Sequence, residues 1–205
     1  MPMVMPHARN RHVRYLAACV LVIAFAVGHS AQTHAAVDAG APTTPQQAAT
    51  PAELDAYLAS QGSPMAGQGA AFVASGSMWK MDARLLVAIA GAESSFGKIT
   101  CGPFNAWGYG CPNNPFGWSS WADAIDTVTK GLRTNYIGEG RTSVALIQQK
   151  YAPSGATNDP NGLNNYWVTN VSRFYRELGG NPDNVDIYGV GGSRPVGVER
   201  SPVSE

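Results

Sequence analysis

One helix is predicted by the stretch Met81-Asp-Ala-Arg-Leu-Leu-Val-Ala-Ile-Ala-Gly-Ala-Glu-Ser-Ser-Phe-Gly97, and the rest of the chain can be placed around it. Asp82 is suited to the N-cap because its side-chain oxygen can accept a hydrogen bond from a free backbone N–H. The final glycine can adopt the left-handed conformation that ends a helix. Leu86, Ile89 and Glu93 recur at spacings of three and four, so they share one face of this helix.

Glu93 is the last member of that otherwise apolar face. Partial burial and the negative end of the helix dipole both disfavour a charged carboxylate, so we expect a raised pKa. A carboxyl group that keeps its proton near neutral pH is what a general acid at a glycosidic bond requires. The alternative is a surface glutamate in a frayed last turn. The residues that follow the helix favour the first interpretation.

Residues 98–118 form a long segment without periodicity, rich in Gly, Pro and Asn. Loops of this length inside a compact domain usually carry function. Trp107, Tyr109 and Trp118 would suit a groove for sugar rings, because apolar ring faces stack on aromatic side chains while amides bond hydroxyl and acetamide groups. These aromatic residues could instead pack the loop onto the helices. The cluster beside Glu93 favours the groove.

Two of the three cysteines, Cys101 and Cys111, lie in this loop. In an exported protein such a pair indicates one disulfide that closes a small ring, worth roughly 2–3 kcal/mol in the chain-entropy model. Two thiols without a neighbouring cluster of His or Cys cannot complete a tetrahedral metal shell. We therefore expect no metal site and no cofactor.

The first 35 residues resemble an export signal, with a basic stretch followed by an apolar run from residue 15 to residue 27. This run is short for a membrane span, which favours a cleaved signal. An uncleaved membrane anchor is the alternative. Without residues 1–35 the chain has 11 basic and 14 acidic residues, which argues against nucleic-acid binding. We expect a monomer exported to the periplasm or the cell exterior that meets a membrane only through its N-terminal segment, followed by a flexible linker at residues 36–49.

Residues 50–179 are predicted to form one all-α domain. No stretch makes a convincing sheet, although the loop leaves room for one short β-hairpin. Thr50 with Glu53 and Ser120 with Asp123 have the spacing of helix caps, and Thr142 is expected to cap a third helix. Residues 180–205 lack periodicity and are predicted to be a disordered tail. The predicted helices span residues 51–60, 66–76, 82–95, 120–137, 143–150 and 164–178.

The stretch from Leu85 to Gly97 resembles the catalytic helix of bacterial peptidoglycan hydrolases in the lysozyme-like superfamily. Asn105-Ala-Trp-Gly108 after a short gap is similar to the glucosaminidase family, in which an Asn-x-aromatic-Gly element follows the glutamate. The related lytic transglycosylases usually continue into a Gly-Leu-Met-Gln element that this chain lacks. Tyr151-Ala-Pro153 and the pair Tyr166-Trp167 also resemble the C-terminal half of both families, so the resemblance covers about residues 51–179.

The resemblance implies a lysozyme-like fold and cleavage of the β-1,4 bond between amino sugars in peptidoglycan glycan strands. Glu93 matches the catalytic acid, and Tyr151 matches a tyrosine near the reacting sugar. The cysteine-bearing insertion departs from the family pattern and leaves the groove contacts open. The expected substrate contacts are Ser94, Asn105, Trp107, Tyr109 and Tyr166.

A glycosidase needs a proton donor and a group that stabilises the oxocarbenium-like centre. Asp159, in a polar loop, is the candidate for a second catalytic carboxylate, whereas helix capping accounts for Asp123. A substrate-assisted route, in which the N-acetyl oxygen attacks the anomeric carbon, needs only Glu93 and is preferred. Hydrolysis and transglycosylation to an anhydro sugar both remain open, as does a non-catalytic peptidoglycan-binding module. All four histidines precede residue 36, which removes Ser-His and Cys-His dyads from the domain.

Overall fold

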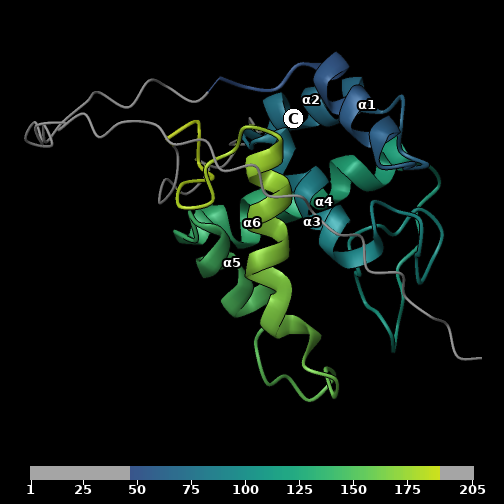
Figure 1. Ribbon diagram of the computed structural model, residues 1–205, viewed down its shortest axis with the longest axis vertical. Helices are drawn as coiled ribbons and strands as arrows, with labels where there is room; N and C mark the ends of the chain where they lie inside the picture. Colours follow the sequence, from purple (N-terminus) through teal and green to yellow (C-terminus); the bar gives the residue numbers. More distant parts are fainter. Residues whose placement is uncertain (1–46, 190–205) are drawn as a thin grey trace, which may run out of the picture. The chain divides into compact units, whose positions relative to one another are not determined.

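The computed structural model describes residues 47–189, which belong to one compact unit. This part of the chain is all-helical and contains no β-strand, so the predicted all-α fold is confirmed (Figure 1). Residues 98–118 form consecutive turns rather than a hairpin. The elements in chain order are α1 (Pro51–Ser60), α2 (Gly69–Trp79), α3 (Ala83–Ser94), α4 (Trp121–Asn135), the 3-10 helix η1 (Ile137–Glu139), α5 (Val144–Tyr151), the 3-10 helix η2 (Leu163–Tyr166) and α6 (Trp167–Glu177).

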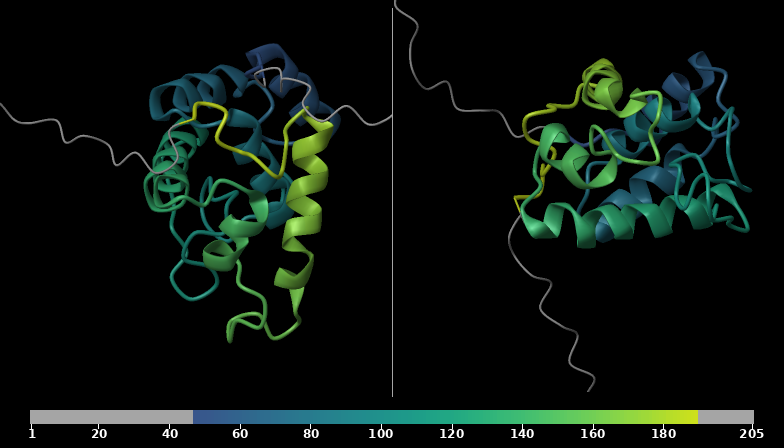
Figure 2. Two further views of the ribbon diagram at one scale, coloured as in Figure 1. Left: turned by 90° about the vertical axis from the view of Figure 1, so that its left-hand side faces the viewer. Right: turned by 90° about the horizontal axis from the view of Figure 1, so that it is seen from below.

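The α3 helix is the central element, as its apolar sequence predicts, and most of its residues are buried. It contacts α2, α4 and α6. The right-hand view of Figure 2 has α4 and α6 on opposite sides of the molecule, with α3 between them. Residues 83–91 of α3 are buried, whereas Ala92 and Glu93 in its last turn are partly exposed.

Both ends of α3 are held by specific residues. Asp82 is the N-cap, as predicted, and its side chain accepts a hydrogen bond from the backbone N–H of Arg84. The C-terminal prediction needs correction, because the left-handed backbone begins at Ser95 and not at Gly97. This early turn brings Phe96 back into the core, where its ring lies 4.8 Å from that of Phe174. The packing of Phe96 in the core therefore stabilises a left-handed backbone at Ser95, although glycine adopts this conformation more easily.

The other helices follow the predicted pattern with shifted boundaries. The Thr50 capping box and the Ser120 cap are present as expected. Thr142 is not the cap of α5: Ser143 takes this place, and its hydroxyl accepts from the N–H of Leu146. The predicted helix at 66–76 lies at residues 69–79, and the first turn of the helix predicted at 164–178 is the 3-10 helix η2.

The ordered part extends past residue 179, where the predicted tail begins. The N–H of Val144 donates to the carbonyl of Pro182, and the N–H of Val185 donates to the carbonyl of Thr142. Val185 is fully buried. Residues 182–185 therefore pack against the start of α5, and Tyr188 lies under the Lys80 ammonium group, which corrects the predicted boundary of the tail.

The predicted signal segment at residues 1–35 and most of the predicted linker lie outside the described residues, as do residues 190–205 of the predicted tail. Between residues 47 and 189, no helix combines the length and apolar character that crossing a membrane requires.

Candidate active site

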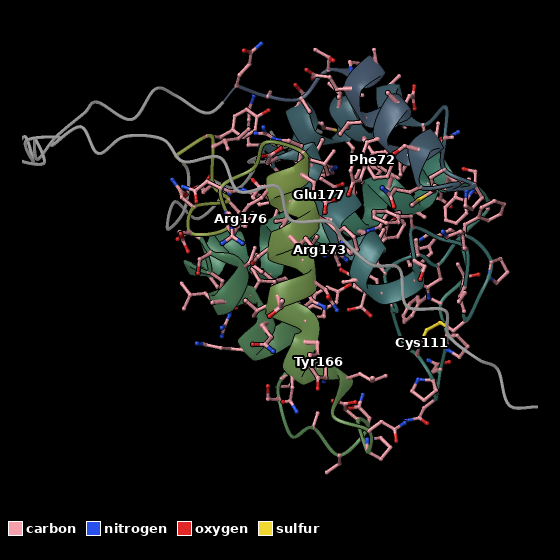
Figure 3. All side chains as sticks on the ribbon, in the orientation of Figure 1. Phe72, Cys111, Tyr166, Arg173, Arg176 and Glu177 are labelled. Carbon is pink, nitrogen blue, oxygen red and sulfur yellow. A yellow bond between two sulfur atoms is a disulfide. The ribbon has the colours of Figure 1, made fainter. Side chains whose placement is uncertain are left out.

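A cleft of about 830 Å³ opens at the C-terminal end of α3. One wall comes from residues 99–112 of the long loop, and the other comes from the end of α5 together with residues 158–170. Cys111 and Tyr166, which are labelled in Figure 3, belong to these two walls. Glu93 lies in the last turn of α3, where the two walls meet its helix.

The Glu93 carboxyl is half-buried in this cleft. Its Oε1 accepts a hydrogen bond of 2.6 Å from Nε1 of Trp167. Its Oε2 lies beside Gly108, where an added Cβ would come within 2.9 Å of that oxygen. Glycine at 108 therefore leaves the space that the carboxyl occupies.

Burial raises the pKa of Glu93 to about 7, while the hydrogen bond from Trp167 acts in the opposite direction. Near neutral pH the group is consequently present in both its protonated and its ionised form. A carboxyl in this state can donate a proton in one step and accept one in the next. The predicted cause, burial at the end of an apolar helix face, is the one that the structure provides.

Tyr151 lies close to Glu93 and lines the cleft. Its hydroxyl donates a hydrogen bond to the backbone carbonyl of Trp107, and its ring lies 5.4 Å from that of Trp167. Burial, together with the nearby charge of Glu93, raises its pKa well above the ordinary value. Tyr151 thus remains a neutral phenol that joins the two walls of the cleft.

Two other predicted contacts also line the cleft. Tyr166 is 64% exposed and stands on the outer side of the second wall. Tyr109 is half-buried in the first wall, with its ring 6.2 Å from that of Tyr151. Trp118, which the sequence pattern also suggests for the groove, does not line it; its ring packs against Tyr109 at 6.0 Å.

The remaining three predicted contacts border the cleft, but their side chains are buried and hold the wall from behind. The indole of Trp107 is fully buried and donates to the carbonyl of Leu86. The Asn105 amide is likewise buried and donates to the carbonyls of Tyr109 and Phe116. These side chains therefore support the loop from behind the surface of the cleft that they border.

The hydroxyl of Ser94 donates to the carbonyls of Ala90 and Ala106 and accepts from the N–H of Gly97. It borders the cleft and its side chain is buried, so these hydrogen bonds hold the wall in place at this residue. Its position explains this role, because Ser94 links the last turn of α3 to the loop that follows.

The functional residue that the sequence pattern misses is Trp167. Its place on the apolar stripe of the last helix predicts a core residue, and it is indeed buried. However, a buried indole N–H needs an acceptor, and here the acceptor is Glu93. The sequence offers two signals for such a residue: this donor without an assigned acceptor, and the resemblance that the pair Tyr166-Trp167 bears.

Cys101 and Cys111 form the predicted disulfide, and both line the cleft. A disulfide at this place is compatible with an exported protein. It closes the same turn that the Asn105 amide spans, so the first wall is held by one covalent and two polar links. This arrangement compensates for the absence of regular secondary structure in the loop.

Asp159 is the other acidic residue that lines the cleft within the described residues. Its two carboxylate oxygens accept from the backbone N–H groups of Leu163 and Asn164, each at 2.8 Å. Asp123 accepts from Ser119 and does not line the cleft, in agreement with its predicted capping role. The arrangement thus supplies one proton-exchanging carboxyl at Glu93 and one carboxylate committed to the backbone.

No group of three His, Cys, Asp or Glu side chains in residues 47–189 is placed to hold a metal ion. The cleft offers instead a carboxyl that exchanges its proton near pH 7, aromatic side chains and side-chain amides. Such a set can protonate a leaving oxygen and bind a polar ring with apolar faces. No family model matches the chain, and no curated protein matches it.

Proposed function

We propose that this protein cleaves a β-1,4 bond between N-acetylated amino sugars in peptidoglycan glycan strands, with Glu93 as the general acid. The observation that carries the proposal is the half-buried Glu93 carboxyl, with its pKa near 7, on the wall of an 830 Å³ cleft. The resemblance of residues 85–108 to peptidoglycan hydrolases points to the same reaction.

In the first step, protonated Glu93 gives its proton to the glycosidic oxygen as the C–O bond breaks. Trp167 donates to Oε1 and so leaves Oε2 as the oxygen that carries the proton. Oε2 lies beside Gly108, in the part of the site without a competing side chain. The geometry thereby assigns one carboxyl oxygen to each task.

The positive charge that develops on the sugar needs a partner. The substrate-assisted route suits this site, because both oxygens of Asp159 already accept backbone hydrogen bonds. In that route the acetamide oxygen of the substrate attacks the anomeric carbon and forms a cyclic intermediate. Ionised Glu93 then takes a proton from water, whose oxygen opens this ring and completes hydrolysis.

Two alternatives share the cleft. If a hydroxyl of the same sugar attacks in place of water, the product is an anhydro sugar and the protein is a lytic transglycosylase. If no bond is cleaved, the protein is a peptidoglycan-binding module. The disulfide is compatible with any of these roles outside the cytoplasm.

The test compares the wild type with Glu93→Gln on purified peptidoglycan and weighs the products by mass spectrometry. We expect the variant to lose activity by about 10²–10⁴-fold, the usual contribution of a general acid, while glycan binding persists. Glu177→Gln, which changes an exposed carboxyl outside the cleft, is the matched control and should keep its activity.

The products distinguish the three candidate functions. Hydrolysis adds one water to the product, whereas an anhydro product is lighter by one water and indicates the transglycosylase. Wild-type binding without any product indicates the binding module. Full activity of Glu93→Gln would remove the acid from the mechanism.

A further inference from the structure

The cleft contains negative but no positive side chains. Glu93 and Asp159 line it, and no Lys or Arg does so among the described residues. When Glu93 is protonated for catalysis, the Asp159 carboxylate remains. A substrate that brings a second negative charge would therefore find no cation to pair with.

The basic residues nearest in sequence to the lining residues are directed to other partners. Lys98 precedes the first wall, and its Nζ donates to the carbonyl of Gln61. Lys150 precedes Tyr151, and its Nζ binds the carboxylate of Glu139 at 2.8 Å. Both ammonium groups are thus engaged, and the lack of positive charge in the cleft is built into the fold.

The outer edges of the cleft are apolar. Ile99, on the first wall, is 75% exposed, and Leu163, on the second, is 67% exposed. Half of the large exposed hydrophobic residues in the described part of the chain line this one cleft, since Tyr166 also belongs to it. Exposed apolar groups gathered at a cleft indicate contact with apolar parts of a ligand.

Resting on the proposed function, we infer that the cleft disfavours a free lactyl carboxylate on muramic acid and selects glycan strands in which this carboxyl is capped as an amide. A stem peptide provides such a cap at the lactyl position. The methyl groups of the acetamide, lactyl and peptide units then fit the edges formed by Ile99 and Leu163. Strands from which the peptides have been removed carry free carboxylates and are disfavoured.

The size of the discrimination follows from Coulomb's law. Two like charges several ångströms apart at a protein surface repel by an amount that changes a rate constant tenfold or more. Salt weakens this repulsion between exposed charges. The discrimination should consequently decrease as ionic strength rises, which a difference in shape would not do.

The experiment uses one set of glycan strands in three forms: with peptides, denuded by an amidase, and denuded with the lactyl carboxyls converted to methylamides. We expect kcat/KM on denuded strands to be about tenfold lower than on the methylamide form at low salt, and the two to converge in high salt. Equal rates on these two forms would overturn the inference. Failure to cleave any form, including the peptide-bearing one, would instead overturn the proposed function.

Variants test the charge directly. Asn158→Lys places a cation in the lining, and Asp159→Asn removes the anion while keeping an acceptor for the backbone. Each should raise the rate on denuded strands relative to the methylamide form by several-fold. Asp183→Asn, an exposed acid outside the cleft, should leave this ratio unchanged. A ratio that neither Asn158→Lys nor Asp159→Asn alters would show that charge does not select the substrate.

Discussion

The two walls of the cleft differ in how their backbone groups and polar side chains form hydrogen bonds. In the loop wall, residues 98–118 have no regular hydrogen-bonding pattern, and the side chains of Asn105 and Trp107 bond backbone carbonyls. Facing this loop, α6 of the second wall and the neighbouring α3, together called the helical wall below, satisfy their own backbones, and the side chains of Glu93 and Trp167 bond to each other.

This difference explains why polar and aromatic residues of similar type serve different ends. A buried backbone group must find a partner, so an irregular segment uses its own side-chain amides, here that of Asn105, to supply one. A helix has no such need in its interior, and its polar side chains can face a ligand. In the helices, polar side chains are thus available to contact a ligand. In the irregular loop, polar side chains form hydrogen bonds to the backbone.

The largest effect that tests this comparison is expected for Trp107→Ala. The indole is fully buried, packs edge-on against Phe72 and donates to the carbonyl of Leu86, so its removal leaves a cavity and breaks this hydrogen bond. We expect a loss of about 3–5 kcal/mol in the free energy of unfolding, measured by denaturant titration. Tyr166→Ala, at an exposed position in the other wall, should change it by less than about 0.5 kcal/mol. Comparable losses in both variants would contradict the division between support and contact.

The next effect concerns the cost of keeping Glu93 half-buried. Its pKa rises from 4.5 to about 7 in the folded state, so the folded protein retains a proton that the unfolded chain has lost. Stability from this group is therefore greatest below pH 4.5 and declines up to about pH 7, by roughly 3 kcal/mol in total. Glu93→Gln has no proton to lose, and it should gain this amount over the wild type between pH 4 and pH 8.

Glu53→Gln is the control, because the fold lowers the pKa of Glu53 whereas it raises that of Glu93. Hydrogen bonds from the Thr50 backbone and hydroxyl lower the pKa of Glu53. Its carboxylate stabilises the fold at high pH and loses this effect as pH falls through the lowered pKa. The deficit of Glu53→Gln should thus grow as pH rises to about 4.5 and stay constant above it, whereas the gain of Glu93→Gln should develop above pH 4.5. Thermal melts from the acid range to pH 8 would contradict the burial argument if Glu93→Gln showed no gain over the wild type above pH 4.5.

The fold was largely predictable because its signals are local. Apolar spacing locates α3, and short-range caps locate the starts of α1 and α4 through Thr50 and Ser120. The packing of residues 182–185 was not predictable, since it depends on backbone pairing between Thr142 and Val185, which are distant in sequence. The spacing of apolar residues in the sequence does not predict such a contact.

The site was predictable to the same extent. The position of Glu93 at the end of an apolar face and the spacing of the two cysteines can be recognised without a structure. The inward orientation of Asn105 and Trp107 could not, because it depends on where the folded loop places backbone carbonyls, that of Phe116 for Asn105 and that of Leu86 in α3 for Trp107. The partner of Trp167 is likewise a tertiary feature, as 74 residues separate it from Glu93.

The smallest expected effect is also the most specific to the helical wall. Trp167→Phe keeps an aromatic ring but removes the donor to Oε1 of Glu93. Since this hydrogen bond lowers the pKa of Glu93, its loss should raise that pKa above about 7. The alkaline limb of kcat/KM should move to higher pH, and the rate below the limb should fall by about tenfold because the carboxyl is no longer oriented.

Trp121→Phe is the matched control, because Trp121 packs against Phe104 at 5.2 Å and does not line the cleft. Both variants lose part of a packed indole, and both should show somewhat lower melting temperatures. Only the loss of a donor to the acid can displace the limb of the pH profile. If Trp167→Phe lowers stability while its pH profile coincides with that of the wild type, Trp167 is a core residue as its sequence pattern suggests. The helical wall would then support the site in the same manner as the loop.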